Sequence, residues 1–178
     1  TAALITPDRT LTRQVTAVLD RWGILPDDSA GKPLSLSAPG RFLRHVADLT
    51  GEKLTSDRLL VLLKHPLTGS GAERGQHLLF TRDLELKLRR EGPAFPDGNA
   101  LRAWAAASGK PGALAWAEWL SNCICGLDEI RTAPLAEHVA RHRMLSETLA
   151  AGPGRPGSGA LWLKEAGTAA LTLMDDLA

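Results

Sequence analysis

Basic side chains near the end of a predicted helix are the best candidates for chemistry in this chain, because cations bind nucleic-acid phosphates. They are Lys87, Arg89 and Arg90, in the run Lys-Leu-Arg-Arg. Cations at the carboxyl end of a helix also interact favourably with the helix dipole, and this alone explains them structurally. Arg41 and Arg44 are the second pair of candidates, and the further contributors are Arg9, Arg13 and His45. This set predicts weak, non-specific, salt-dependent DNA contact.

Two histidines are spaced to share one face of a helix. His138 and His142 stand four residues apart. A zinc protease motif requires Glu directly after the first His, and Val139 occupies that position. Because no third ligand lies nearby and Arg141 and Arg143 flank the second histidine, a solvated basic face is favoured over a metal site.

The two cysteines of the chain, Cys123 and Cys125, are separated by one residue. They are too close for a disulfide that closes a useful loop. They follow Trp116 and Trp119 in an apolar stretch, so we expect both to be small buried residues of a helix. Two free thiols fit the reducing cytoplasm best, which is where we expect the protein to be.

No motif for nucleotide binding or hydrolysis is complete. Gly31-Lys32 is not a phosphate-binding loop, because Pro26 and Pro33 occupy the positions where that loop needs glycine and a hydroxyl residue. No Gly-x-Ser-x-Gly elbow occurs, and the adjacent aspartate pairs lie where surface charge is the default. We therefore expect no catalytic residue, no cofactor and no metal ion in this chain.

Three tryptophans, Trp104, Trp116 and Trp119, can either stack on unpaired bases or pack in a core. Trp116 and Trp119 have helical spacing and stand among alanines, so core packing is favoured.

Composition limits the class of protein. The chain has 178 residues, 44% of them hydrophobic and 23% charged, which is typical of a globular domain. The net charge of +1 shows no overall basic excess, so any DNA contact must come from a local patch. No apolar run is long enough to span a membrane, and the chain does not open on a signal-peptide pattern.

The elements that must position these residues are helical. An apolar run at 2–6 predicts one buried strand, and Asp8 can cap the helix that follows it. Helical periodicity with start and stop signals then predicts about eight helices. They lie near 8–22, 40–50, 56–65, 72–90, 97–108, 112–125, 136–150 and 160–177, with loops at 25–39 and 152–159.

The opening of the chain resembles a known family. The segments LITPDR at 4–9, WGI at 22–24 and DSAGKPL at 28–34 are similar to the second RecA-like domain of the AddB-type subunit of the AddAB helicase–nuclease, an inactivated superfamily 1 helicase. The run LLVLLKHPL at 59–67 resembles a helix end inside the insertion of such proteins, and Ala-Leu-Trp at 160–162 is a weaker echo.

The resemblance implies a mainly α fold: a helical insertion domain at 35–178, preceded at 1–34 by the strand–helix start of a RecA-like α/β domain. It also implies a non-catalytic fragment of a subunit that acts in double-strand break repair, DNA end processing and recombination. The implied partners are an AddA-type helicase–nuclease subunit and DNA, and no membrane. ATP with magnesium and an iron–sulfur cluster belong to other parts of such a complex.

Two other classes of function remain open. One is a stand-alone helical protein-interaction module, which a large exposed apolar face would favour. The other is an enzyme of unrecognised type, which a deep polar pocket with convergent acids or histidines would favour.

Overall fold

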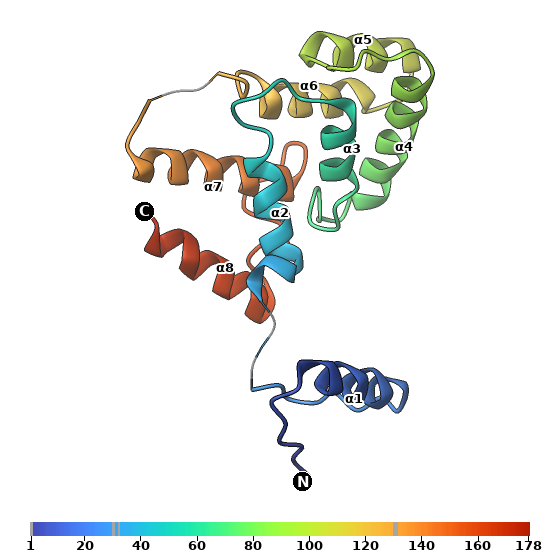
Figure 1. Ribbon diagram of the computed structural model, residues 1–178. Coiled ribbons are helices and arrows are strands. Elements are labelled where there is room, and N and C mark those ends of the chain that lie inside the picture. Colours follow the sequence, from blue (N-terminus) through green and yellow to red (C-terminus); the bar gives the residue numbers. More distant parts are fainter. Residues whose placement is uncertain (1, 30, 32, 130–131) are drawn as a thin grey trace. The chain divides into compact units, whose positions relative to one another are not determined.

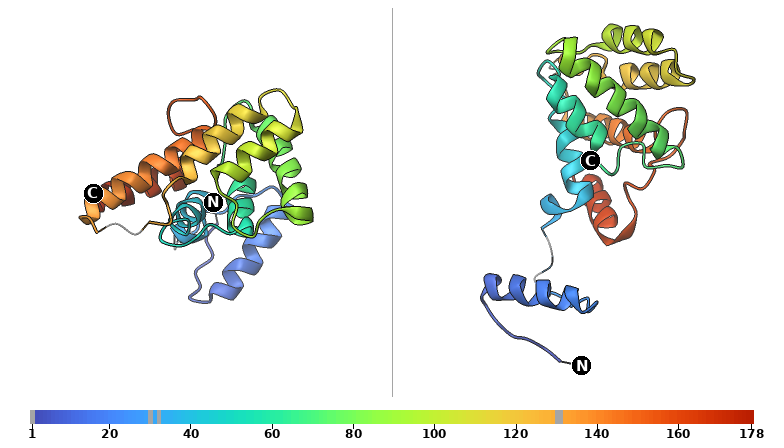
Figure 2. Two further views of the ribbon diagram at one scale, coloured as in Figure 1. Left: turned by 90° about the horizontal axis from the view of Figure 1, so that it is seen from above. Right: turned by 90° about the vertical axis from the view of Figure 1, so that its right-hand side faces the viewer.

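The computed structural model describes residues 2–29, 31, 33–129 and 132–178, and in these residues the protein is mainly helical (Figures 1 and 2). The chain divides into two compact units, residues 1–32 and residues 33–178, and each is described by itself. Lys32 of the Gly31-Lys32 pair lies outside the described residues, as does Ala30 before it.

The helices agree with the periodicity of the sequence, and the prediction of a mainly α chain is confirmed. Their bounds are α1 Arg9–Arg21, the 3₁₀ helix η1 Leu34–Leu36, α2 Ala38–Ala47, α3 Ser56–Lys64, α4 Arg74–Glu91, α5 Gly98–Ser108, α6 Ala113–Ile124, α7 Leu135–Ala151 and α8 Lys164–Asp176. No described helix is both long enough and apolar enough to cross a membrane.

Side-chain caps fix several of the helix starts. Asp8 caps α1 as predicted, its carboxylate accepting from the backbone N–H of Thr10 at 2.7 Å. Thr55 accepts from Arg58 at the start of α3, and Asp97 caps α5. Each cap pairs a backbone donor that a helix start otherwise leaves without a partner.

The strand predicted at 2–6 is not formed, since these residues adopt no regular secondary structure. A strand needs the hydrogen bonds of a neighbouring strand, and the described part of the chain contains none. An apolar run alone therefore does not make a strand, and Ile5 is 94% exposed.

The first unit consists of α1 and its flanking segments. Its apolar stripe follows the predicted spacing, but no described side chain in this unit is buried. Trp22, for example, is 77% exposed.

In the second unit, α3, α4, α5 and α6 enclose an aromatic core (Figure 1). Trp116 lies at its centre, with its ring centroid 5.6 Å from that of Trp104 and 5.8 Å from that of Phe80. The Trp116 Nε1–H donates to Nδ1 of the buried His77 at 3.1 Å, and His77 Nε2 lies 2.8 Å from the carbonyl oxygen of Leu63. Because Nδ1 accepts, Nε2 carries the proton and donates to Leu63, so this histidine is neutral and fully paired. The prediction that the tryptophans pack in a core is confirmed for Trp104 and Trp116.

The remaining helices form two smaller apolar clusters around α2. Phe42 and Val46 of α2 pack with Leu149 of α7 in one of them. Leu43, on another side of α2, packs with Val139 of α7 and with α8. Helix α2 thus contacts both α7 and α8.

Candidate nucleic-acid interface

The basic residues predicted at the end of α4 are present there, but two of the three are already paired. Lys87 forms an ion pair with Glu91 at 3.1 Å, and Arg89 forms one with Glu85 at 2.8 Å. Arg90 forms no ion pair with a described residue. Both carboxylates lie on the same helix, and Glu85 also pairs with Lys64 of α3 at 2.7 Å.

A second group of basic side chains lies at the other end of α4, and we call it the His65 cluster: Arg41, His45, His65 and Arg74. It joins α2, the turn after α3 and the first residue of α4. Arg41 and His45 are one helical turn apart on α2, and His45 lies on the same side of the helix as the buried Phe42, since both rings contact His65.

His65 is the buried member of this cluster. Its Nδ1 accepts from the backbone N–H of Leu67 at 3.2 Å, so the neutral ring carries its proton on Nε2. Its ring centroid lies 5.2 Å from that of Phe42 and 5.9 Å from that of His45. Burial, together with the smaller effects of the neighbouring His45, Arg41 and Arg74, lowers the pKa of His65 to about 4. His65 is therefore uncharged at neutral pH, and the basic groups that lower its pKa are its neighbours.

Arg74 is held in place by the backbone. Its Nη1 donates to the carbonyl oxygen of Thr68 at 2.6 Å, and the Thr68 hydroxyl donates to the carbonyl oxygen of Leu62. Burial lowers the pKa of Arg74, yet arginine stays charged in proteins. The positive charge at the start of α4 is thus fixed by the turn after α3.

The five predicted DNA-contacting residues do not form one patch. Lys87 follows Arg74 by 13 residues of continuous helix, which at about 1.5 Å per residue separates them by about 20 Å. Arg41 belongs to the His65 cluster at the near end, and Arg44 points to a different surface, a groove described below. Arg74 and His65 were not among the residues predicted to contact DNA. The sequence feature that marks His65 is the His-Pro pair that follows α3.

The histidines and cysteines considered as metal ligands differ in how far they are buried. His138 is exposed, as expected, whereas His142 is partly buried and its pKa is lowered by burial, so the prediction of a fully solvated face is wrong for His142. Cys123 is buried as predicted, but Cys125 is exposed, because α6 ends at Ile124 and the chain turns outward there. Among residues 2–29, 31, 33–129 and 132–178, no group of three or more His, Cys, Asp or Glu is arranged to hold a metal ion.

Comparison with known protein families, with curated proteins and with solved structures gives no match for this chain.

Proposed function

We propose that this chain is a non-catalytic helical segment of an AddB-type helicase–nuclease subunit, and that it guides DNA through phosphate contacts at the His65 cluster. The proposal combines the sequence resemblance at 4–34 and 59–67 with the placement of the cations. In this proposal the parent complex acts in the cytoplasm on double-strand ends, together with an AddA-type subunit.

The single observation that carries the DNA contact is the uniform sign of the charges around His65. All the charged groups that act on the pKa of His65 are cationic: His45, Arg41 and Arg74. At the far end of α4, in contrast, Arg89 and Lys87 form ion pairs with Glu85 and Glu91. A phosphate group near Arg41 is therefore attracted by these positive charges.

The chemistry suits a backbone contact rather than sequence readout. Arg41 is exposed and its guanidinium can bind two phosphate oxygens at once. The partly exposed His45 adds charge when it is protonated, and Arg74 adds a fixed charge beneath them. Such contacts position DNA but carry no sequence information.

The test is a fluorescence anisotropy titration of labelled duplex and single-stranded DNA at low salt. We expect dissociation constants of about 10⁻⁴–10⁻⁶ M, the range of non-specific binding. The variant Arg41→Ala/His45→Ala should weaken binding at least about fivefold and reduce the salt slope by about 1. The matched control Lys87→Ala/Arg89→Ala/Arg90→Ala should have the smaller effect, because two of its cations are paired. The absence of binding, or binding that Arg41→Ala/His45→Ala leaves unchanged, would contradict the proposal.

A protein-interaction module is the second candidate, and a specific observation favours it. A wide apolar groove lies open in the second unit, and the apolar stripe of α1 is exposed in the first. These surfaces are compatible with either function, since a subunit of a complex also binds protein.

A further inference from the structure

A groove of about 980 Å³ opens in the second unit beside α2, α7 and α8. Helix α2 contributes one stripe to it at the spacing i, i+3, i+4 and i+7: Gly40, Leu43, Arg44 and Ala47. Helix α7 contributes His138, Val139, Arg141, His142, Met144, Leu145 and Thr148, and the end of α8 contributes Leu173, Met174 and Leu177. The end of α6 with the segment after it, the 3₁₀ helix η1 and the turn after α2 complete the lining.

The groove leaves large apolar side chains in contact with water. Met144 is 65% exposed, and Leu173 and Leu177 are each 45% exposed. Contiguous exposed apolar surface of this kind is typical of a binding site. Methionine is common on such surfaces because its flexible thioether adapts to the shape of a partner.

The charged residues of the groove are mainly positive. Arg44 and Arg141 line it, and neither forms an ion pair with a described residue. Four other arginines of the described residues each form an ion pair with a carboxylate. These pairs are Arg58–Glu52, Arg89–Glu85, Arg143 with Glu147 and Asp175, and Arg155–Glu73. Glu129 is the one carboxylate among the described lining residues.

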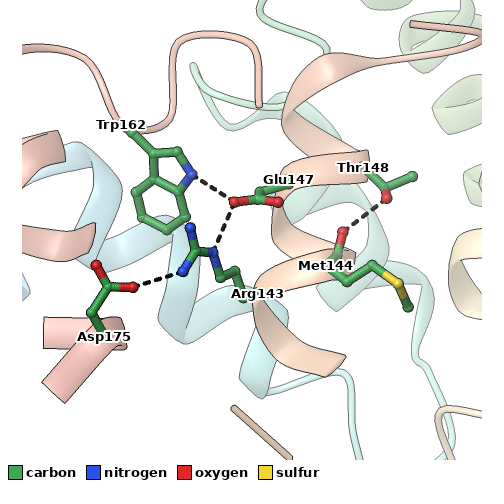
Figure 3. A network of polar contacts seen from close by, with 6 residues as sticks. All are labelled: Arg143, Met144, Glu147, Thr148, Trp162 and Asp175. Atoms are coloured by element: carbon green, nitrogen blue, oxygen red, sulfur yellow. Dashed lines mark hydrogen bonds and ion pairs between the residues drawn. The ribbon is translucent and has the colours of Figure 1, made fainter. Parts of the chain in front are cut away.

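A network outside the groove lining braces α7 against α8, as Figure 3 shows. Arg143 Nη1 lies 2.7 Å from Asp175 of α8, and its Nε lies 3.1 Å from Glu147 on its own helix. Glu147 also accepts from the indole N–H of Trp162 at 2.9 Å, which ties α7 to the segment before α8. This network joins α7 to α8 before any partner arrives, and such preorganisation lowers the entropic cost of binding.

From these observations we propose that the groove binds an amphipathic helix of a partner protein, whose apolar stripe is flanked by aspartate or glutamate. The apolar lining accepts the stripe in the helix-in-groove mode. The two unpaired arginines, Arg44 and Arg141, complement the acidic flanks and fix the orientation of the helix. This inference does not depend on the DNA contact at the His65 cluster.

Cys125 provides a reporter, because it is exposed and lines the groove. Cys123 is buried and burial raises the pKa of its thiol to about 12, so a thiol-directed dye labels Cys125 selectively. The full chain with bimane on Cys125 is titrated with a synthetic helical peptide of about 16 residues, long enough for four turns. It carries leucine at i, i+3, i+4 and i+7 and glutamate on both flanks. The control peptide has lysine in place of each glutamate.

We expect a saturable change in bimane emission with the acidic peptide, and at least tenfold weaker binding of the basic peptide. The variant Arg44→Glu/Arg141→Glu should reverse this preference, whereas Arg90→Glu, a matched change outside the groove lining, should preserve it. Circular dichroism checks that each variant is folded. Equal binding of both peptides, no binding, or a preference that Arg44→Glu/Arg141→Glu leaves unchanged would overturn the proposal. A change in emission with protein concentration alone, together with a dimer in sedimentation, would show that a second copy fills the groove, and this would also overturn it.

Discussion

The second unit contains two regions that differ in how far their apolar side chains are buried and how completely their polar groups are paired. In the aromatic core of α3–α6, Trp116, His77 and Leu63 satisfy one another's polar atoms and the side chains close around them. Around α7 and α8, apolar side chains stay in contact with water, and Arg44 and Arg141 have no carboxylate partner in the described residues. The first region serves stability, because its central polar atoms, those of Trp116 and His77, are paired internally. The second is free to bind, because its pairing is incomplete.

The largest expected effect is on the free energy of unfolding, which a change in the aromatic core should lower much more than a change in the groove. Trp116→Ala removes the central ring of the aromatic core and leaves the Nδ1 of His77 without its donor. We expect a loss of about 3–5 kcal/mol in the free energy of unfolding, as for buried Trp→Ala changes. The matched groove variant Leu173→Ala should cost less than about 1 kcal/mol, because its side chain is 45% exposed. Urea denaturation followed by circular dichroism measures both, and similar costs would show that the groove residues belong to the core.

The pH dependence of stability sharpens the comparison next. Burial lowers the pKa of His65, His77 and His142, so the folded protein binds protons less readily than the unfolded chain. Above pH about 6.5 both states are neutral at these residues, and no difference arises. Below it the unfolded chain takes up protons first, so the free energy of unfolding falls by about 1.4 kcal/mol per pKa unit of difference at each site. For His65 this loss continues until the pH reaches about 4.

The variant His65→Asn tests the assignment of this loss. Asparagine keeps an acceptor for the Leu67 N–H but does not titrate. Urea midpoints measured between pH 6.5 and 4.5 should depend less steeply on pH in the variant than in the unchanged protein. Equal slopes would mean that His65 does not contribute to the acid sensitivity.

The sequence predicted the helices well, because their apolar residues have a local helical period and several helices begin at a local cap. Asp8 and Thr55 are examples, since both cap the helix that follows them. It failed where the outcome depends on distant partners. The run at 2–6 has strand composition but no neighbouring strand, and Cys125 became exposed because α6 ends one residue earlier.

The candidate site shows the same limit. The spacing of Lys87, Arg89 and Arg90 is visible in the sequence, and two of their carboxylate partners lie within one turn. The His65 cluster is not visible in this way, because Arg41 and Arg74 stand 33 residues apart (74 − 41) and meet only through the turn after α3. The groove also joins α2 to α7 and α8, which are remote in the chain.

The smallest expected effect concerns the brace between α7 and α8. Asp175→Asn removes one of the two carboxylates that contact Arg143, and the side chain of Asp175 is 58% exposed. Solvent screens such a pair, so we expect a loss of less than about 1 kcal/mol in the free energy of unfolding. The acidic peptide should bind with an affinity within about fivefold of the original, since 1 kcal/mol corresponds to a factor of about five. Glu147 would still hold Arg143 and Trp162, so one wall of the groove keeps its position. Urea denaturation and the bimane titration measure the two quantities. If Asp175→Asn abolished peptide binding with little loss of stability, the pair would be part of the binding surface rather than a brace behind it.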